Sequence, residues 1–320
     1  MSRGVSAEYQ LADGHSGGAE RSGARCCEGP ELMSRQPLRR LIKTSCHPGL
    51  LGVPGRWAGR RFGYRLRYGP RIIIDNPAEY MQSEILRSGV YERRVAEVIL
   101  ALGEPGDLVL DVGANMGQHT LIAAWHGMHV HAFEPLPRVA ARLRANVALN
   151  KLQGRVSVFE SAVSSSEGTA TLHEMEGADD GSHSLLALGA AEHRSAVDVR
   201  TVTLDGHLRS EKCGFPALVK IDVEGVEALV LDGAEQTIGQ GRPIVILETG
   251  DRLADMLGES AATVIARLLD SSYRVFQMLR EGISGEEVPR PPVPRDVCNY
   301  IAVPRESKRL PAVLRALWLE

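Results

Sequence analysis

Aromatic residues are scarce in this chain, because Phe, Trp and Tyr together make up only 5% of its 320 residues. Its core must therefore be built mainly from Val, Leu, Ile and Ala, and the 43% hydrophobic content suffices for at least one complete core. An excess of positive charge is also missing, since 37 Lys and Arg residues stand against 40 Asp and Glu residues. The net charge of -3 argues against a basic nucleic-acid-binding protein, so no nucleic-acid partner is expected.

Long hydrophobic runs are missing too. No stretch reaches the roughly 18 apolar residues that a membrane-spanning helix needs, so no transmembrane segment is expected. The first residues do not combine a basic segment with an apolar region, so we expect no signal peptide. The five cysteines form no C-x-x-C pair, which favours reduced thiols and a cytoplasmic protein. Cys26, Cys27 and Cys46, with His47 nearby, match no standard zinc spacing, and no metal site is expected there.

Composition divides the chain into three regions. Residues 1–66 are basic and rich in Gly, Ser and Arg, without a sustained hydrophobic period, and are expected to be poorly ordered. Residues 67–306 form the predicted folded domain, with regular structure starting near Arg71, where the sequence RIIID is a candidate strand. Residues 307–320 are predicted to form a surface helix.

The folded domain alternates between predicted strands and predicted helices. Apolar residues at helical spacing predict helices over residues 90–102, 117–126, 136–150, 225–234 and 259–269. Between them lie candidate strands, among them DLVLD, HVHAFE, RVSVFESAV, ALVKID, PIVILE, YRVFQML and NYIAVP. This alternation predicts an α/β fold with a doubly wound sheet, largely parallel and covered by helices on both faces. TATLHE and VDVRTVTL are expected to pair as additional strands.

Four acidic residues end predicted strands: Asp111, Glu134, Asp222 and Glu248. In doubly wound sheets, ligands bind in the crevice beyond the carboxyl ends of the strands. Four acids at equivalent positions therefore predict a binding site at this edge of the sheet.

The first of these acids opens the stretch DVGANMG, residues 111–117. Gly113 and Gly117 permit positive φ and close backbone approach, and Asn115 tolerates the left-handed region. Glu134 follows Asp111 by 23 positions, at the next strand end, where a carboxylate accepts two hydrogen bonds from a ribose diol. The dinucleotide fingerprint G-x-G-x-x-G is absent, and two acids suit an amine and a sulfonium better than a pyrophosphate. The pattern therefore favours S-adenosylmethionine.

A second acidic motif is LVKIDVEGVEALVLDGA, residues 218–234. The carboxylates of Asp222, Glu224 and Glu227 lie within six residues and repel one another unless a cation, hydrogen-bond donors or water compensate. Asp222 is assigned to the site, because a strand-end acid beside a cofactor cleft has little structural reason to exist. Glu227 is either a site residue or an acid at a helix N-terminus, where the macrodipole favours it.

Together these motifs resemble the FkbM family of S-adenosylmethionine-dependent methyltransferases. The resemblance rests on DVGANMGQHTL, AFEP, the N-V-x-L-N end of a helix, KIDVEGVEALVLDGA, RPIVILE and NYIAVP, and it covers roughly residues 90–304. It implies a class I methyltransferase fold, a Rossmann-like doubly wound sheet of seven strands in the order 3-2-1-4-5-7-6 with the last strand antiparallel. It also implies O-methylation of a hydroxyl group on a sugar, a glycolipid or a secondary metabolite.

The resemblance also assigns cofactor-binding residues by their position in the motifs. Asp111, Gly113, Asn115 and Gly117 are expected around the methionine part of S-adenosylmethionine, with Asp222 beside the cofactor. Glu134 is expected to hold the ribose. Ser161 and Ala162, after the third strand, are expected near the adenine.

Methylation of a hydroxyl also requires removal of its proton by a nearby carboxylate or imidazole. The candidates are Asp222, Glu224, His119 and His183, of which Asp222 is the best placed by strand topology. A solvated loop histidine is an equally good interpretation of His183. His119, just inside a helix, is interpreted rather as a surface or capping residue. Asp179 and Asp180 could be combined with Asp222 into a magnesium site, but the sequence does not show that their oxygens converge, and no metal is predicted.

Two other functions stay open. One is an NAD-dependent oxidoreductase, against which the missing G-x-G-x-x-G counts. The other is a methyltransferase fold retained as a non-catalytic binding module, against which the intact glycine and acid positions count. The motif N-P-P-[YFW], common in methyltransferases that act on amino groups, is absent after ALVKI, where D-V-E-G stands instead. This absence favours oxygen over exocyclic nitrogen as the methyl acceptor. The expected partner is a small molecule or glycan with a hydroxyl group, and neither the acceptor nor the oligomeric state follows from the sequence.

Overall fold

A computed structural model describes residues 63–175, 183–184, 193–250, 260–279, 282–283, 297–309 and 311. All of them belong to one compact unit, residues 47–320. The predicted N-terminal region up to residue 62 lies outside the described residues, as does most of the predicted C-terminal helix. None of the helices in the described part of the chain is long and apolar enough to span a membrane.

The central sheet contains eight strands in the order β13-β12-β14-β11-β10-β3-β4-β5. The strands β3, β4, β5, β10 and β11 are parallel, whereas β14 runs antiparallel to both β11 and β12. Counted along the chain without the short edge strand β13, the order is 3-2-1-4-5-7-6, as expected. The bounds are β3 Leu108–Val112, β4 His129–Phe133, β5 Val156–Phe159, β10 Leu218–Ile221, β11 Ile244–Thr249, β12 Tyr273–Leu279, β13 Gly282–Ile283 and β14 Cys298–Pro304.

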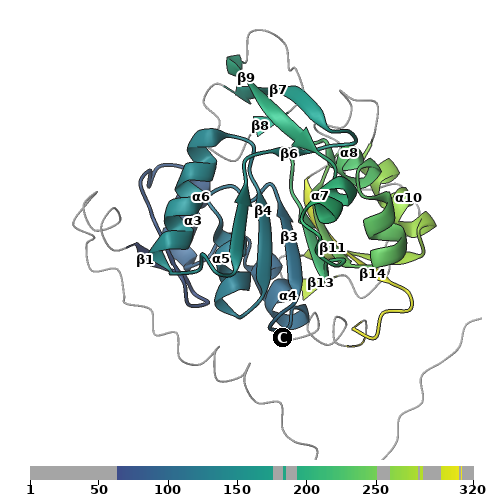
Figure 1. Cartoon of the computed structure of the whole chain (residues 1–320). Coiled ribbons are helices and arrows are strands. Elements are labelled where there is room, and N and C mark those ends of the chain that lie inside the picture. Colours follow the sequence, from purple (N-terminus) through teal and green to yellow (C-terminus); the bar gives the residue numbers. More distant parts are fainter. Residues whose placement is uncertain are drawn as a thin grey trace, which may run out of the picture. The chain divides into compact units, whose positions relative to one another are not determined.

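Helices cover both faces of this sheet (Figure 1). One face carries α3 (Tyr80–Ser88), α4 (Arg93–Leu102), α5 (Gln118–Trp125) and α6 (Pro137–Leu149). The other face carries α7 (Leu204–Ser210), α8 (Glu227–Asp232), the π-helix η1 (Thr237–Gly241) and α10 (Ala261–Asp270).

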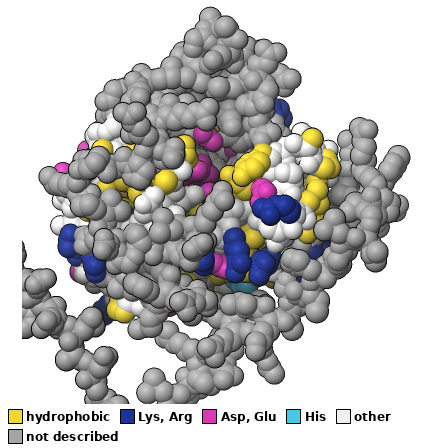
Figure 2. Space-filling model, turned by 180° about the vertical axis from the view of Figure 1, so that it is seen from behind, with side chains coloured by type: hydrophobic (Ala, Val, Ile, Leu, Met, Phe, Trp, Pro, Cys, Tyr) yellow, Lys and Arg dark blue, Asp and Glu magenta, His cyan; other side chains and the backbone are white. Residues whose placement is uncertain are grey.

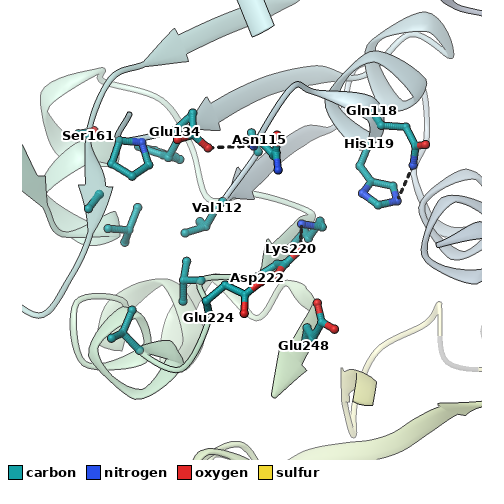
Figure 3. Close-up of a pocket in the computed structure, with 18 of the residues that line it drawn as sticks. Val112, Asn115, Gln118, His119, Glu134, Ser161, Lys220, Asp222, Glu224 and Glu248 are labelled. Atoms are coloured by element: carbon teal, nitrogen blue, oxygen red, sulfur yellow. Dashed lines mark hydrogen bonds and ion pairs between the residues drawn. The ribbon is translucent and has the colours of Figure 1, made fainter. Parts of the chain in front are cut away.

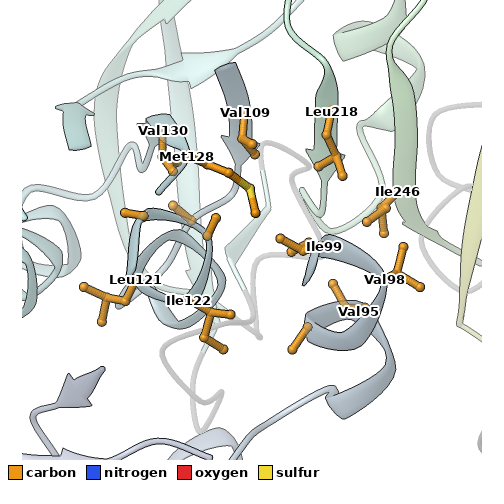
Figure 4. Close-up of a cluster of buried hydrophobic side chains, with 14 of the residues drawn as sticks. Val95, Val98, Ile99, Val109, Leu121, Ile122, Met128, Val130, Leu218 and Ile246 are labelled. Atoms are coloured by element: carbon orange, nitrogen blue, oxygen red, sulfur yellow. The ribbon is translucent and has the colours of Figure 1, made fainter. Parts of the chain in front are cut away.

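Successive strand residues point to opposite faces, as the period of a strand requires. Val109 and Leu218 join the core beneath α4 and α5, where they pack near Ile99 (Figure 4). Leu110 and Val219 join the core on the side of α8 and α10. The strands are therefore buried on both sides, which explains their continuous apolar runs.

A second, smaller sheet has the order β6-β9-β7-β8. Its strands are β6 (Ala162–Val163), β7 (Gly168–Met175), β8 (His183–Ser184) and β9 (His193–Val202). The predicted pairing of TATLHE with VDVRTVTL is confirmed, since β7 and β9 pair antiparallel. The prediction of one strand over RVSVFESAV is wrong, because β5 pairs with β4 in the central sheet whereas β6 pairs with β9 in the small one.

Regular structure begins earlier than the predicted start near Arg71, because β1 (Tyr64–Arg65) pairs with β2 (Arg71–Ile72). β2 is also shorter than RIIID. After β2, backbone amides donate hydrogen bonds to side chains and not to another strand. The Ile73 amide donates to Asn146 Oδ1 at 2.8 Å, and the Asp75 amide donates to Gln82 Oε1 at 2.9 Å. The N-terminal hairpin is thereby tied to α6.

Asn146 also donates through Nδ2 to the carbonyl of Met116 at 2.8 Å, so it joins the glycine turn to the N-terminal segment. We expect Asn146→Ala to lower the free energy of unfolding by about 2–4 kcal/mol, because it leaves the partly buried amide of Ile73 and the buried carbonyl of Met116 without partners. Asn150→Ala is the matched control, since Asn150 bonds the backbone of Arg71 where water can replace it. Urea denaturation measures both, and equal losses would contradict the assigned role of Asn146.

Candidate functional site

A pocket opens beyond the carboxyl ends of β3, β4, β10 and β11 (Figure 3). It contains about 980 Å³ of empty space, a volume that includes the solvent at its open mouth. Its walls come from the glycine turn after β3, the residues that follow β4, β10 and β5, and Leu172 of β7. Met81 of α3 and the Tyr91–Glu92 corner before α4 complete the wall.

The glycine turn packs directly against the end of β10. Gly113 has φ of 76°, and a Cβ there would lie 1.8 Å from the carbonyl oxygen of Asp222, so no other residue fits. Asn115 has φ of 50° and lines the pocket with Gly113. Gly117 has φ of 91°, but a Cβ there would meet Leu143 of α6 at 2.1 Å. Gly117 therefore allows close helix packing and is not among the residues lining the pocket.

Glu134 lies at the tip of β4 with its carboxylate held by backbone amides. Oε2 accepts from the Asn115 amide at 3.1 Å and Oε1 accepts from the Leu136 amide at 2.9 Å. A carboxylate has about four acceptor positions, so acceptor capacity remains for two hydroxyl donors. Glu134 is buried, and this burial raises its pKa to about 7. Ser161, just before β6, lies on the same side of the pocket as Glu134 (Figure 3), and Ala162 of β6 also lines the pocket.

A buried ammonium balances two of the strand-end acids. Lys220 Nζ lies 3.0 Å from Asp222 Oδ2 and 3.7 Å from Asp111 Oδ1. Burial alone would lower the pKa of Lys220, but the carboxylates of Asp222 and Asp111 outweigh it and raise the pKa above its ordinary value. Asp111 also accepts from Thr120 Oγ1 at 2.5 Å, and it lies behind the pocket wall rather than on it. Asp222 is on the wall, beside Lys220.

Asp222 and Glu248 carry unlike protonation states. Burial and then Asp222 raise the pKa of Glu248 to about 10. Burial opposes ionisation of Asp222 too, but Lys220 outweighs it and lowers the pKa of Asp222 below its ordinary value. The two side chains are hydrogen-bonded to each other, so near neutral pH protonated Glu248 donates to ionised Asp222.

Glu224 and Glu227 follow on the same loop. Glu224 lines the pocket with φ of 55°, and burial together with Asp222 and Glu227 raises its pKa to about 8. Glu227 is buried in the first turn of α8 and accepts from the Gly225 amide at 2.8 Å, outside the lining of the main pocket. The interpretation of Glu227 as an acid at a helix N-terminus therefore agrees with its position.

The Tyr91–Glu92 corner is held from two directions. The side-chain amide of Gln118 accepts from the Tyr91 amide at 2.7 Å and donates to the Tyr91 carbonyl at 2.8 Å. Asn299 Nδ2 of β14 donates to Glu92 Oε1 at 2.6 Å. Glu92 has φ of 44°, and together with Asn115 and Glu224 it is one of three non-glycine pocket residues in the left-handed region. Such backbone strain persists only where surrounding contacts fix it, and it gathers at functional sites.

The two candidate histidines differ in position. His119 is buried and lines the pocket, so its interpretation as a surface or capping residue is wrong. Burial and then Lys220 lower its pKa to about 4, which keeps the imidazole neutral. The backbone of His183 lies in β8, while its side chain is outside the described residues, as are Asp179 and Asp180.

Acidic character dominates the site. Figure 2 shows Asp and Glu side chains gathered in a hollow on one face of the molecule, between hydrophobic side chains. Among the described residues, no group of three or more His, Cys, Asp or Glu side chains is arranged to hold a metal ion.

Sequence reasoning missed Lys220, Glu92 and Gln118. The contact of Lys220 with Asp222 could have been predicted, because Lys220 precedes Asp222 by two residues and residues two apart on a strand share a face. Glu92 and Gln118 had no such signal, since only the tertiary fold brings the residues just before α4 to the start of α5 and to the start of β14.

The raised pKa of Glu248 predicts a pH effect on stability. Between its ordinary value of 4.5 and about 10 the folded protein keeps a proton that the unfolded chain loses, so this contribution to stability falls as the pH rises. Glu248→Gln does not titrate, so its melting temperature should fall less than that of the wild type between about pH 5.5 and 8.5. The exposed Glu104→Gln serves as the control, and equal falls in all three proteins would contradict the prediction.

Comparison with known proteins identifies the family. A family model described as the methyltransferase FkbM domain matches residues 111–275. The chain is 30% identical over 181 residues to the hexuronic acid methyltransferase AglP of Haloferax volcanii, covering 57% of this chain and 70% of that protein. It is 32% identical over 239 residues to the 31-O-demethyl-FK506 methyltransferase FkbM of Streptomyces tacrolimicus, covering 66% of this chain and 87% of that protein.

Solved structures include more distant matches. The methyltransferase FkbM from Methylobacillus flagellatus has a TM-score of 0.40 and 15% identity, over 70% of this chain and 46% of that one. Magnesium protoporphyrin IX methyltransferase from Synechocystis, solved with bound S-adenosylmethionine, has a TM-score of 0.41 and 14% identity, over 72% of this chain and 86% of that one. The matched family domain spans half of the chain and contains the glycine turn, Glu134 and the Lys220–Asp222 pair, so this chain belongs to the FkbM methyltransferase family.

Proposed function

We propose that the protein transfers a methyl group from S-adenosylmethionine to a hydroxyl of a sugar, a glycolipid or a secondary metabolite. The observation that carries the proposal is that Gly113 and Glu134 directly follow two neighbouring, paired strands, inside the matched methyltransferase domain. The names of the two curated relatives, one for a hexuronic acid and one for an O-demethylated macrolide, support an oxygen acceptor.

The residues of the pocket fit S-adenosylmethionine. Gly113 lines the pocket and lets the turn pack against the carbonyl of Asp222, where the Cβ of any other residue would collide. Glu134 has acceptor capacity left for the two ribose hydroxyls, after its bonds to two backbone amides. Ser161 and Ala162 would border the adenine, with Asn115 and Asp222 nearer the methionine part and Asp111 acting through Lys220.

When bound, S-adenosylmethionine supplies an electrophilic methyl group. The protein contributes mainly by positioning, for which held geometry is worth up to about 7–11 kcal/mol of the barrier. The acceptor hydroxyl also needs a proton acceptor. Glu224 suits this role best, since it lines the pocket and its pKa of about 8 matches the working range of a general base.

Asp222 and Glu248 have different roles from Glu224. Asp222 is paired with Lys220 and is a weaker base, so it keeps a fixed negative charge beside the reaction and orients its neighbours. Glu248 already holds a proton near neutral pH and donates it to Asp222. His183, carried by β8, stays a candidate for contact with the acceptor.

Calorimetric titration with S-adenosylhomocysteine tests the cofactor assignment, with NAD as the competing ligand. The wild type should bind S-adenosylhomocysteine and not NAD, whereas Glu134→Ala should weaken the binding by about 10- to 100-fold, because it removes hydrogen bonds to a charged acceptor. The exposed Glu104→Gln should bind as the wild type does.

A folded wild type that binds NAD instead would favour the oxidoreductase. One that binds S-adenosylhomocysteine but transfers no methyl group to any hydroxyl acceptor would favour the non-catalytic binding module.

A further inference from the structure

We propose that Glu92 is a specificity-determining residue of the pocket, whose carboxylate favours a cofactor bearing a positive sulfonium over its uncharged product form, S-adenosylhomocysteine. The inference rests on the proposed function, because it takes S-adenosylmethionine as the ligand. It adds a residue outside the matched domain, which begins at residue 111.

The order of the strands decides which part of a ligand lies near Glu92. The tips of β5, β4, β3, β10 and β11 follow one another along one edge of the sheet. Neighbouring strands are about 4.8 Å apart, so Glu134 on β4 and Asp222 after β10 are separated by about 10 Å along this edge. A nucleoside held at Ser161 and Glu134 leaves the rest of the ligand on the side of β10, β11 and the Tyr91–Glu92 corner.

This side of the pocket carries an excess of acid. Its carboxyl groups are those of Glu92, Asp222, Glu224 and Glu248. Lys220 is the one Lys or Arg among the described residues that line the pocket, and Asp111 and Asp222 already engage its ammonium. A ligand cation is therefore favoured here over a neutral group of similar size.

Glu92 is the acid best suited to select a ligand charge. Asp222 is balanced by Lys220, Glu248 is protonated, and the pKa of Glu224, raised to about 8, lies above that of Glu92. Glu92 instead receives its hydrogen bond from the neutral amide of Asn299, which fixes the carboxylate without cancelling its charge. The two hydrogen bonds between Gln118 and Tyr91 hold the backbone of the left-handed corner. Together with the bond from Asn299, they fix the carboxylate of Glu92 before any ligand binds.

The preference should depend on pH. Burial and then Asp222 raise the pKa of Glu92 to about 7, so its charge is complete only above neutral pH. As the pH rises through about 7 and Glu92 ionises, the preference for a cationic ligand should grow. The titratable and charged groups that surround this carboxyl are Tyr91, Asp111, His119, Lys220, Asp222, Glu224 and Glu248.

Three ligands separate charge from shape. S-adenosylmethionine and sinefungin are cationic, the second with an ammonium group in place of the methylsulfonium, whereas S-adenosylhomocysteine is neutral at the sulfur. Their dissociation constants are measured by calorimetry at about pH 8 for the wild type, Glu92→Gln and Glu104→Gln. Glutamine keeps an acceptor for Asn299, and Glu104 is exposed at the opposite end of β3, so the control removes an equal charge elsewhere.

Glu92→Gln should reduce the preference for both cationic ligands over S-adenosylhomocysteine by about five- to tenfold, with less than about a twofold change for S-adenosylhomocysteine itself. Glu104→Gln should behave as the wild type. Equal ligand preferences in all three proteins, with S-adenosylhomocysteine still bound, would overturn the inference and leave the proposed function standing.

Other results are equally decisive. A folded wild type that binds none of the three ligands would overturn the proposed function and the inference together. If Glu92→Gln does not fold, the wild type itself is titrated between about pH 6.5 and 8.5, where the preference for S-adenosylmethionine over S-adenosylhomocysteine must rise. A preference that does not change with pH would then overturn the role of Glu92.

Discussion

Lys220 lies buried between Asp111 and Asp222 at the edge where β3 and β10 end, and the charges of the pocket depend on this contact. The pairing of the two strands places Lys220 opposite Asp111, so the sheet itself brings the ammonium to the acids. A carboxylate buried alone is neutralised or destabilises the fold, whereas one paired with an ammonium stays charged. Asp222 can therefore remain ionised, and its charge in turn helps to raise the pKa values of Glu248 and Glu224.

The same strand edge combines rigidity with unequal protonation. Gly113 lies against the carbonyl of Asp222, Glu134 is held by two backbone amides, and Gln118 and Asn299 fix the Tyr91–Glu92 corner. A ligand therefore meets groups whose positions are set before binding, which lowers the free-energy cost of ordering them. The ionised Asp222 and the protonated Glu248 are hydrogen-bonded to each other. Lys220 contacts Asp222 and lowers its pKa, whereas burial and the neighbouring carboxylates raise the pKa of Glu248. The protonation states of these two acids are therefore set by their surroundings and not by residue type.

The elements that could be predicted from the sequence are those with local signals. Continuous apolar strands alternating with amphipathic helices predicted the doubly wound sheet, and the strand-end acids predicted the edge that carries the pocket. The resemblance supplied the strand order. The break between β5 and β6 was missed because a single apolar stretch contains two strands that belong to different sheets. The strand β1 was missed because two residues are too few to show an alternating pattern. Glu92 could not be found, since residues 92 and 299 meet only through the tertiary fold, whereas the Lys220–Asp222 spacing was readable. The predicted roles of the site residues stay predictions until a ligand is bound.

A crystal structure of the protein with S-adenosylhomocysteine would test the central claim most directly, because the claim assigns each part of the pocket to one part of the ligand. We expect both ribose hydroxyls to be hydrogen-bonded to Glu134, the adenine to lie between Ala162 and Leu172, and the sulfur to face Asp222 and Glu92. A ligand bound in the reverse direction, with its adenine near Glu92, or one bound away from the glycine turn, would contradict this claim.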